Sequence, residues 1–182
     1  MKQVIFLLFV MTLSACGSLP KQGAAPAQYD FGISPTTSSS VEFYLGNVTA
    51  PAGLDDSDMR YRLAYQNPTQ VFAYTESRWA ATPAALVARR LQQRWLSTNA
   101  LPCSLNLTLE VFDQVFDSTN SSHAIVRLRA NLQHKGKVST TLIDLEQKSP
   151  SADARGGVAA LITATDAALD KAVSWANDQE CK

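Results

Sequence analysis

Alternation of apolar and polar residues marks three long segments in the second half of the chain, at residues 104–112, 124–133 and 138–147. In the first of these, one side of the strand is expected to carry Leu105, Leu107, Leu109 and Val111. Strands of an antiparallel sheet alternate in this way when only one face is covered. Polar segments between the three supply turns. The pattern therefore predicts three consecutive antiparallel strands with one buried face.

Shorter strands are predicted earlier in the chain. Residues 28–33 form a small apolar patch typical of an edge strand, and residues 41–50 are rich in β-branched and aromatic side chains. Residues 59–66 alternate, an Asn-Pro turn follows, and an apolar run resumes at 71–74. This order predicts a β-hairpin.

Two further segments have the period of an amphipathic helix. Thr82 suits an N-cap and Pro83 suits the first helical position, so a helix is expected from there to Leu101–Pro102. A second helix is expected over residues 154–176. Together the segments predict an α+β fold, a single two-layer domain over residues 29–182. Its sheet is expected to be mostly antiparallel, with both helices packed on one face.

The N-terminus has the layout of a secretory leader. Lys2 precedes an apolar run over residues 4–13, which is shorter than the roughly 20 residues that a transmembrane helix needs. The run ends in Leu-Ser-Ala-Cys, which resembles the bacterial lipobox. The resemblance implies a lipoprotein signal peptide (residues 1–15) and acyl chains such as palmitate on Cys16. The next residues are rich in Ala, Gly, Pro and Gln and have no periodicity, so residues 16–28 are expected to hold the acylated cysteine and a flexible tether. An ordinary cleaved leader with an incidental cysteine is the alternative.

The residue after the lipidated cysteine bears on location. In Gram-negative sorting, an aspartate at that place resembles an inner-membrane retention signal, and this chain has Gly17 instead. We therefore expect a lipid anchor in the outer membrane, with the folded domain on its periplasmic face.

Charge and composition narrow the class of partner. The 182 residues include 16 basic and 16 acidic side chains, so no basic field exists to attract nucleic acid. Charged residues make up 18% of the chain, which is below the usual quarter or so of a soluble domain. Part of the surface is therefore expected to be covered by a partner.

Two cysteines remain after the lipobox. Cys103 follows the first predicted helix, and Cys181 lies after the second. An oxidising periplasm permits disulfides, so a Cys103–Cys181 bridge is expected to hold the C-terminus to the body. Two free thiols are the alternative.

Catalytic and metal-binding groups are sparse. His123 and His134 flank one predicted strand, which at ~3.3 Å per residue holds them roughly 35 Å apart. No nucleophile elbow, zinc-protease motif or P-loop is present. The acidic run at 55–58 lacks the spaced ligands of a calcium loop and is expected to be a solvated turn. We expect neither an enzyme nor a resident metal or cofactor.

The Arg78–Trp79 pair has two interpretations. The tryptophan could fill the core beneath the first helix, with the arginine over its ring or on a carbonyl. Alternatively the pair could anchor a partner, since Trp and Arg dominate interface hot spots.

Several segments, taken in order, resemble the ABC-type transport auxiliary lipoprotein family. The residues that carry the resemblance are Tyr29-Asp30-Phe31-Gly32, Val48, Ala50-Pro51, Leu54-Asp55, Tyr61-Arg62-Leu63, Tyr65, Tyr74, Arg78-Trp79-Ala80 and Pro83. They follow the lipobox and extend over nearly the whole mature chain. A longer serine-rich loop, residues 34–40, departs from the family pattern.

The resemblance implies a non-enzymatic accessory protein. Such lipoproteins accompany an ABC ATPase, a permease and an MCE-domain protein that move hydrophobic molecules between the two membranes. We therefore expect a docking component at the outer membrane. A homo-oligomeric ring, in which each copy exposes a strand edge or an apolar patch, is one form that it could take. A periplasmic carrier of lipid or another hydrophobic ligand, and an outer-membrane assembly factor, are the alternatives.

Overall fold

The computed structural model describes residues 24–33, 39–98 and 102–179. The predicted signal peptide, Cys16 and Cys181 lie outside these ranges, as does most of the serine-rich loop. The strands in chain order are β1 (Ala27–Tyr29), β2 (Ser39–Val41), β3 (Tyr44–Thr49), β4 (Asp58–Leu63), β5 (Phe72–Trp79), β6 (Trp95–Ser97), β7 (Cys103–Ser118), β8 (Ser121–His134) and β9 (Lys137–Lys148). The helices are α2 (Pro83–Arg94), which precedes β6, and α3 (Ala154–Asp178), which follows β9.

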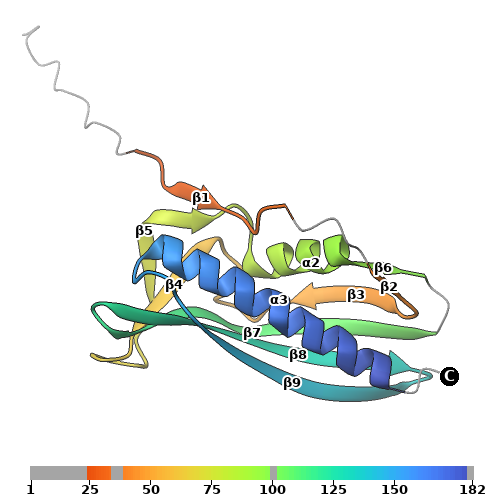
Figure 1. The fold of residues 1–182 in the computed structure, drawn as a ribbon. Helices are drawn as coiled ribbons and strands as arrows, with labels where there is room; N and C mark the ends of the chain where they lie inside the picture. The colour runs from red at the N-terminus through yellow and green to blue at the C-terminus, as the bar shows by residue number, and fades with distance from the viewer. Residues whose placement is uncertain (1–23, 34–38, 99–101, 180–182) are drawn as a thin grey trace, which may run out of the picture.

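A mixed sheet forms one layer, and the two helices pack on it, which confirms the predicted α+β class (Figure 1). The strand order within the described residues is β1-β5-β4-β7-β8-β9, with β3 added beside β7. The β4–β5 hairpin and the β7–β8–β9 meander are antiparallel, as predicted. The remaining pairs of this sheet, β1 with β5, β3 with β7 and β4 with β7, are parallel. A separate small sheet pairs β2 with β6.

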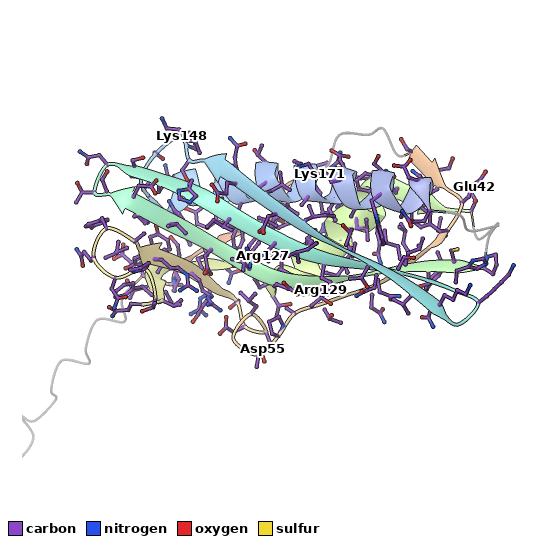
Figure 2. The ribbon with its side chains drawn as sticks, turned by 90° about the horizontal axis from the view of Figure 1, so that it is seen from below. Glu42, Asp55, Arg127, Arg129, Lys148 and Lys171 are labelled. Atoms are coloured by element: carbon purple, nitrogen blue, oxygen red, sulfur yellow. The ribbon has the colours of Figure 1, made fainter. Side chains whose placement is uncertain are left out.

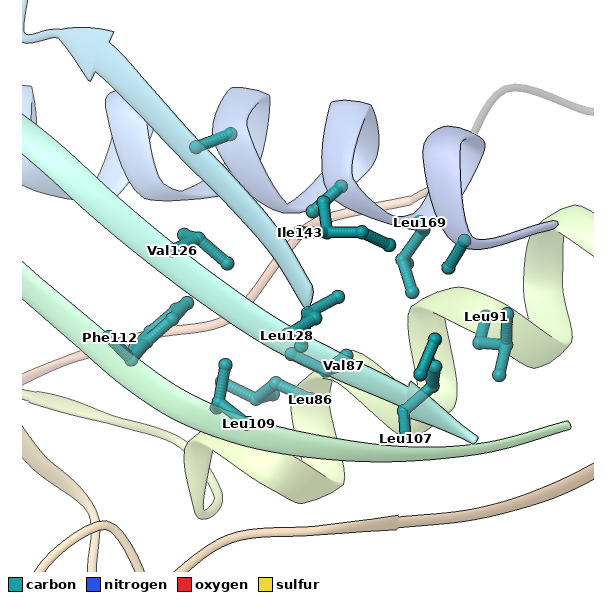
Figure 3. Close-up of a cluster of buried hydrophobic side chains, with 14 of the residues drawn as sticks. Leu86, Val87, Leu91, Leu107, Leu109, Phe112, Val126, Leu128, Ile143 and Leu169 are labelled. Atoms are coloured by element: carbon teal, nitrogen blue, oxygen red, sulfur yellow. The ribbon is translucent and has the colours of Figure 1, made fainter. Parts of the chain in front are cut away.

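The core lies between the sheet and the helices. Figure 3 shows leucine, valine and phenylalanine side chains of β7 and β8 facing those of α2 and α3. Leu105, Leu107, Leu109 and Leu128 are fully buried, as the alternation predicted. Burying one such side chain contributes about 1.5–3 kcal/mol, so this shared layer holds helices and sheet together. Neither described helix is long and apolar enough to cross a membrane.

A register shift in β7 corrects the predicted pattern of that strand. Between Leu109 and Val111 the pairing with β8 slips by one residue, which is a β-bulge. Val111 is therefore only half-buried, and Phe112 takes the inward position. The bulge also lies where the neighbour on the other edge of β7 changes from β3 to β4.

Three predicted boundaries were wrong. The first helix ends at Arg94, because Trp95 takes an extended conformation and begins β6. The predicted strand at 41–50 is divided into β2 and β3, which belong to different sheets. The first strand spans only Ala27–Tyr29, so the tether cannot extend to residue 28, because Ala27 and Gln28 already pair with β5.

Both helices begin at capped N-termini, of which only the Thr82 cap was predicted. Thr82 Oγ1 accepts a hydrogen bond from the Ala85 amide, and Pro83 occupies the first turn. Asp153 caps α3 by accepting from the amide of Gly156 at 2.8 Å. That bond and another from the Ser151 hydroxyl lower the pKa of Asp153.

Candidate functional site

The chain enters the folded body at β1. Gln28 lies opposite Arg78, and Tyr29 lies opposite Trp79. The turn that follows is closed by Asp30 Oδ1, which accepts from the Gly32 amide at 2.8 Å. Gly32 has a φ of +64°, a conformation that glycine adopts without steric cost. This turn ends β1 and leaves Phe31 buried in the core.

Phe31 connects the tether to the core through an aromatic cluster. Its ring lies 5.8 Å from the ring of Trp79 and 6.2 Å from that of Phe112. Trp79 and Phe112 are themselves 5.5 Å apart. Trp79 is only 1% exposed and lies within β5 rather than after it. Its burial favours the core interpretation of this tryptophan, whereas Arg78 is exposed and an interface role for it stays a prediction.

Arg90 of α2 joins the same corner to α3. Its guanidinium is buried, with Nε and Nη2 each 2.7 Å from the carboxylate of Asp166, and Nη1 donates to the Phe31 carbonyl at 3.4 Å. The hydrogen bonds to Asp166 raise the pKa of Arg90. Arg94, one turn later, donates to Asp170. The structure thus brings together two segments of the resemblance, Tyr29–Gly32 and Arg78–Ala80, and joins both to the core.

The opposite end of the molecule carries exposed apolar side chains. Tyr44, Ser104, Gln133 and Val138 lie opposite one another across β3, β7, β8 and β9. Directly opposed residues share a sheet face, so Tyr44 and Val138 lie on the face away from the helices. They are 55% and 60% exposed, and Leu142, four residues along β9, is 48% exposed.

Two other features lie near this distal surface, which we define as Tyr44, Val138 and Leu142. Leu96 of β6 is 57% exposed, and the hydroxyl of its neighbour Ser97 donates to the carbonyl of Phe43. In the described part of the chain, β9 ends the strand order, so its second edge has no partner strand. An unpaired edge beside apolar side chains is a place where another chain can bind.

The outer sheet face beside this surface is charged but locally balanced. Arg127 pairs with Asp144 at 2.8 Å, and Arg129 pairs with Glu110 at 2.6 Å. Figure 2 shows Arg127 and Arg129 along the middle of the molecule. Because each arginine faces a carboxylate, this face has no strong field of one sign and does not favour a polyanion.

A buried polar network is the feature that the sequence did not indicate. Gln114 of β7 is 1% exposed, accepts from the Tyr74 hydroxyl at 2.9 Å, and donates to Ser122 and to the Asp153 carbonyl. Burial raises the pKa of Tyr74 strongly. Gly157 fits against Gln114 because an added Cβ would lie 2.1 Å from its Oε1. With its bonding groups satisfied, this network fixes the start of α3 on the sheet and presents no free nucleophile.

The two histidines and the acidic run, which the sequence offered as possible chemical groups, do not come together in one site. His123 and His134 lie near opposite ends of β8, and His123 contacts Asp117 at 3.0 Å. The acidic run forms a turn in which Asp55 and Asp56 accept from nearby backbone amides. No group of three or more His, Cys, Asp or Glu side chains that could hold a metal occurs among the described residues.

Cys103 begins β7 and is buried in a disulfide bond. The other two cysteines of the chain, Cys16 and Cys181, both lie outside the described residues. The pairing with Cys181, and the acylation of Cys16, therefore stay predictions.

Two surface hollows lie along the seam between β9 and α3. One, of about 370 Å³, includes Lys148 and Thr163 in its lining. The other, of about 340 Å³, includes His134, Lys137 and Asp178. Both open to solvent and include polar side chains, unlike the enclosed apolar cavity that usually buries a hydrophobic ligand.

The sequence matches no established family model and no curated protein. Among solved structures, it is similar to a Xanthomonas campestris protein assigned to the family DUF330, with a TM-score of 0.63 and 15% identity over 83% of this chain and 90% of that one. It is also similar to a protein described as uncharacterized, with a TM-score of 0.61 and 16% identity over 84% of this chain and 97% of that one. At these identities, the likeness shows a shared fold: this chain folds like a bacterial DUF330 protein.

Proposed function

We propose that the protein is a lipid-anchored accessory component of an MCE-type ABC transport system, which docks the periplasmic part of that system at the outer membrane. The lipobox and the ordered motif resemblance support this assignment. The absence of a metal-ligating cluster from the described residues is compatible with it. The protein would act by holding partners in place rather than by chemistry.

The observation that carries the proposal is that the tether and the exposed apolar surface lie in different parts of the molecule. The tether joins at the corner formed by β1, β5 and α2, where Phe31 is locked into the core. The distal surface lies around the start of β7, where Tyr44 is opposite Ser104, whereas the Phe31 corner contacts Phe112 further along the same strand. Eight residues separate Ser104 from Phe112, or roughly 26 Å at ~3.3 Å per residue. A rigid body with an anchor toward one end and an apolar, edge-bearing surface at the other is suited to docking.

The rival carrier function has weaker support. A carrier would enclose its hydrophobic ligand, whereas both hollows along the β9–α3 seam are open and include charged side chains. Native mass spectrometry of protein isolated from membranes separates the two functions, because stoichiometric bound lipid would favour the carrier.

Isolation of the acylated protein from membranes in mild detergent tests docking. We expect the wild type to recover the MCE-domain protein encoded with it. The double variant Y44S/V138S should lose this partner, because it removes two exposed apolar contacts from the distal surface. I33S is the matched control, since Ile33 is 99% exposed but lies beside the tether turn.

The Cys16→Ser variant tests the anchor separately. We expect it to leave the membrane fraction for the soluble periplasm. Recovery of no MCE-domain protein with the wild type, or equal recovery with Y44S/V138S, would count against docking through this surface. Unchanged membrane association of C16S would contradict the lipoprotein assignment itself.

A further inference from the structure

The turn of the β4–β5 hairpin is an exposed segment without charge. Residues 64–71 read Ala-Tyr-Gln-Asn-Pro-Thr-Gln-Val and contain no acidic or basic side chain. Every residue from Tyr65 to Val71 is exposed, and the two large apolar ones, Tyr65 and Val71, are 43% and 40% exposed. Neither side chain is needed to fill the core, so their apolar surface has no structural use within the chain.

This hairpin tip, residues 64–71, is held firmly. The amides of Gln66 and Asn67 donate to the Leu63 carbonyl, and Asn67 Oδ1 accepts from both the amide and the hydroxyl of Thr69. Arg62 of β4 connects the tip to the sheet. Its Nη1 donates to the Pro68 carbonyl at 3.3 Å, and its Nε is paired with buried Asp113 at 2.7 Å.

An aromatic cluster supports the base of the tip. The ring of Tyr61 lies 5.2 Å from Phe72, 4.6 Å from Tyr74 and 5.7 Å from Phe116. These contacts and the bracing by Arg62 fix the direction of the hairpin. Tyr65 and Val71 are therefore presented on a preformed projection.

The tip and the tether share one end of the molecule. β1 runs parallel to β5, with Ala27 opposite Ser77, so the chain before Ala27 leaves in the direction of the start of β5, where the tip lies. In Figures 1 and 2, the β4–β5 turn and the beginning of β1 both lie at the left of the molecule, away from the C-terminal end of α3. The distal surface lies at the far end of β7, since Tyr44 is opposite Ser104.

We propose that the hairpin tip rests in the headgroup layer of the bilayer that holds the acylated Cys16, and so orients the body with its distal surface away from the membrane. This inference rests on the proposed lipid anchor. Tyrosine is favoured at membrane interfaces because its ring is apolar and its hydroxyl stays hydrated. An uncharged tip loses no ion solvation on entering that layer.

Because the tether is short, even a weak contact between the hairpin tip and the bilayer is enough to orient the body. Ten residues, 17–26, separate Cys16 from β1, and at about 5–6 Å × √n the predicted tether is expected to reach roughly 17 Å. A tether of this predicted length gives an effective concentration on the order of millimolar, so the tip need not bind membranes by itself. The acyl chains supply the affinity, and the tip supplies the orientation.

The test uses acylated protein in phosphatidylcholine vesicles that contain lipid brominated near the headgroup end of its chains. Tyr65→Trp should show a blue-shifted emission that bromine quenches, measured as the difference from the wild type with its own three tryptophans. Tyr44→Trp is the matched control, because it makes the same change at a comparably exposed site on the distal surface. Its added emission should be unshifted and unquenched. Val71→Trp provides a second probe on the tip, should Y65W fold poorly.

Added emission from Y65W and V71W that is quenched no more than that of Y44W, in vesicle-bound protein, would overturn the inference and leave the anchor intact. If partner protein shields the tip instead, quenching would be absent in vesicles and the emission would shift only when partner is added, which also overturns it. Failure of the wild type to bind vesicles would overturn the inference together with the anchor.

Discussion

At the scale of single residues, the local environment decides what each side chain can do. Gln114 is a polar side chain in the middle of the fold, and it is tolerated because Tyr74, Ser122 and the Asp153 carbonyl satisfy it. Tryptophan is a residue type common in interface hot spots, but Trp79 is buried against Phe31 and Phe112. The residue type alone therefore indicated neither role.

Asp153 offers a prediction at this scale. Replacing this N-cap with alanine should cost about 1 kcal/mol of stability at neutral pH. Folding lowers the pKa of Asp153 from its ordinary value of 3.8. The ionised carboxylate therefore stabilises the fold fully above about pH 3.8, and this stabilisation is lost as the pH falls through the lower folded-state pKa. Urea unfolding of wild type and D153A should show that the difference between their free energies of unfolding is smaller at acidic pH than at neutral pH. A difference independent of pH would contradict this account.

At the scale of elements, few side chains determine how α2 and α3 sit on the sheet. Arg90 joins α2 to Asp166 of α3 and to the carbonyl of Phe31, whereas Arg94 joins Asp170 at the surface and also stacks over Trp95. The first pair is buried on the arginine side, and the second is exposed to water. Arg94 also lies 3.4 Å from the carboxylate of Asp166 and donates to its carbonyl, so Asp166 contacts both arginines. The energetic roles of the two pairs should therefore differ although their spacing is the same.

The variants D166A and D170A test this difference. D166A leaves the guanidinium of Arg90 buried without its carboxylate and should cost about 3–5 kcal/mol. D170A removes an exposed pair, and Arg94 retains its contacts with Asp166 and with the Trp95 ring, so the loss should be below about 1 kcal/mol. Thermal or chemical unfolding of both variants provides the measurement. Similar losses in the two would show that the Arg90 pair does not lock the helices.

At the scale of the whole molecule, the two ends have different surfaces. One end holds the hairpin tip and the start of β1, and the other holds the distal surface and the disulfide at Cys103. The Phe31 corner lies between them, against Phe112 in the middle of β7. β7 connects the two ends, with β3 and β4 along one edge and β8 along the other. A partner on the distal surface and a bilayer at the tether would thus be held apart by a continuous strand.

The disulfide provides a prediction at this scale. If Cys103 pairs with Cys181, replacing Cys181 by serine should cost about 2–5 kcal/mol and loosen the C-terminus. Mass spectrometry of a non-reduced digest identifies the partner, and thermal unfolding with and without reductant measures the loss. A peptide linking Cys103 to another cysteine would contradict the pairing, and C16S serves as the control because it should leave this bridge intact.

By itself, the sequence determined the features that depend on neighbouring residues: the strand alternation, the β4–β5 hairpin, the capped start of α2 and the α+β class. These follow from backbone geometry and local side-chain pattern. Tertiary structure alone decided the bulge in β7, the early end of α2 at Trp95, and the parallel additions of β1, β3 and β4. It also decided which apolar residues stayed exposed, such as Tyr44 and Val138. These features depend on which distant segments compete for the same strand edge and the same core volume, and no local pattern records that competition.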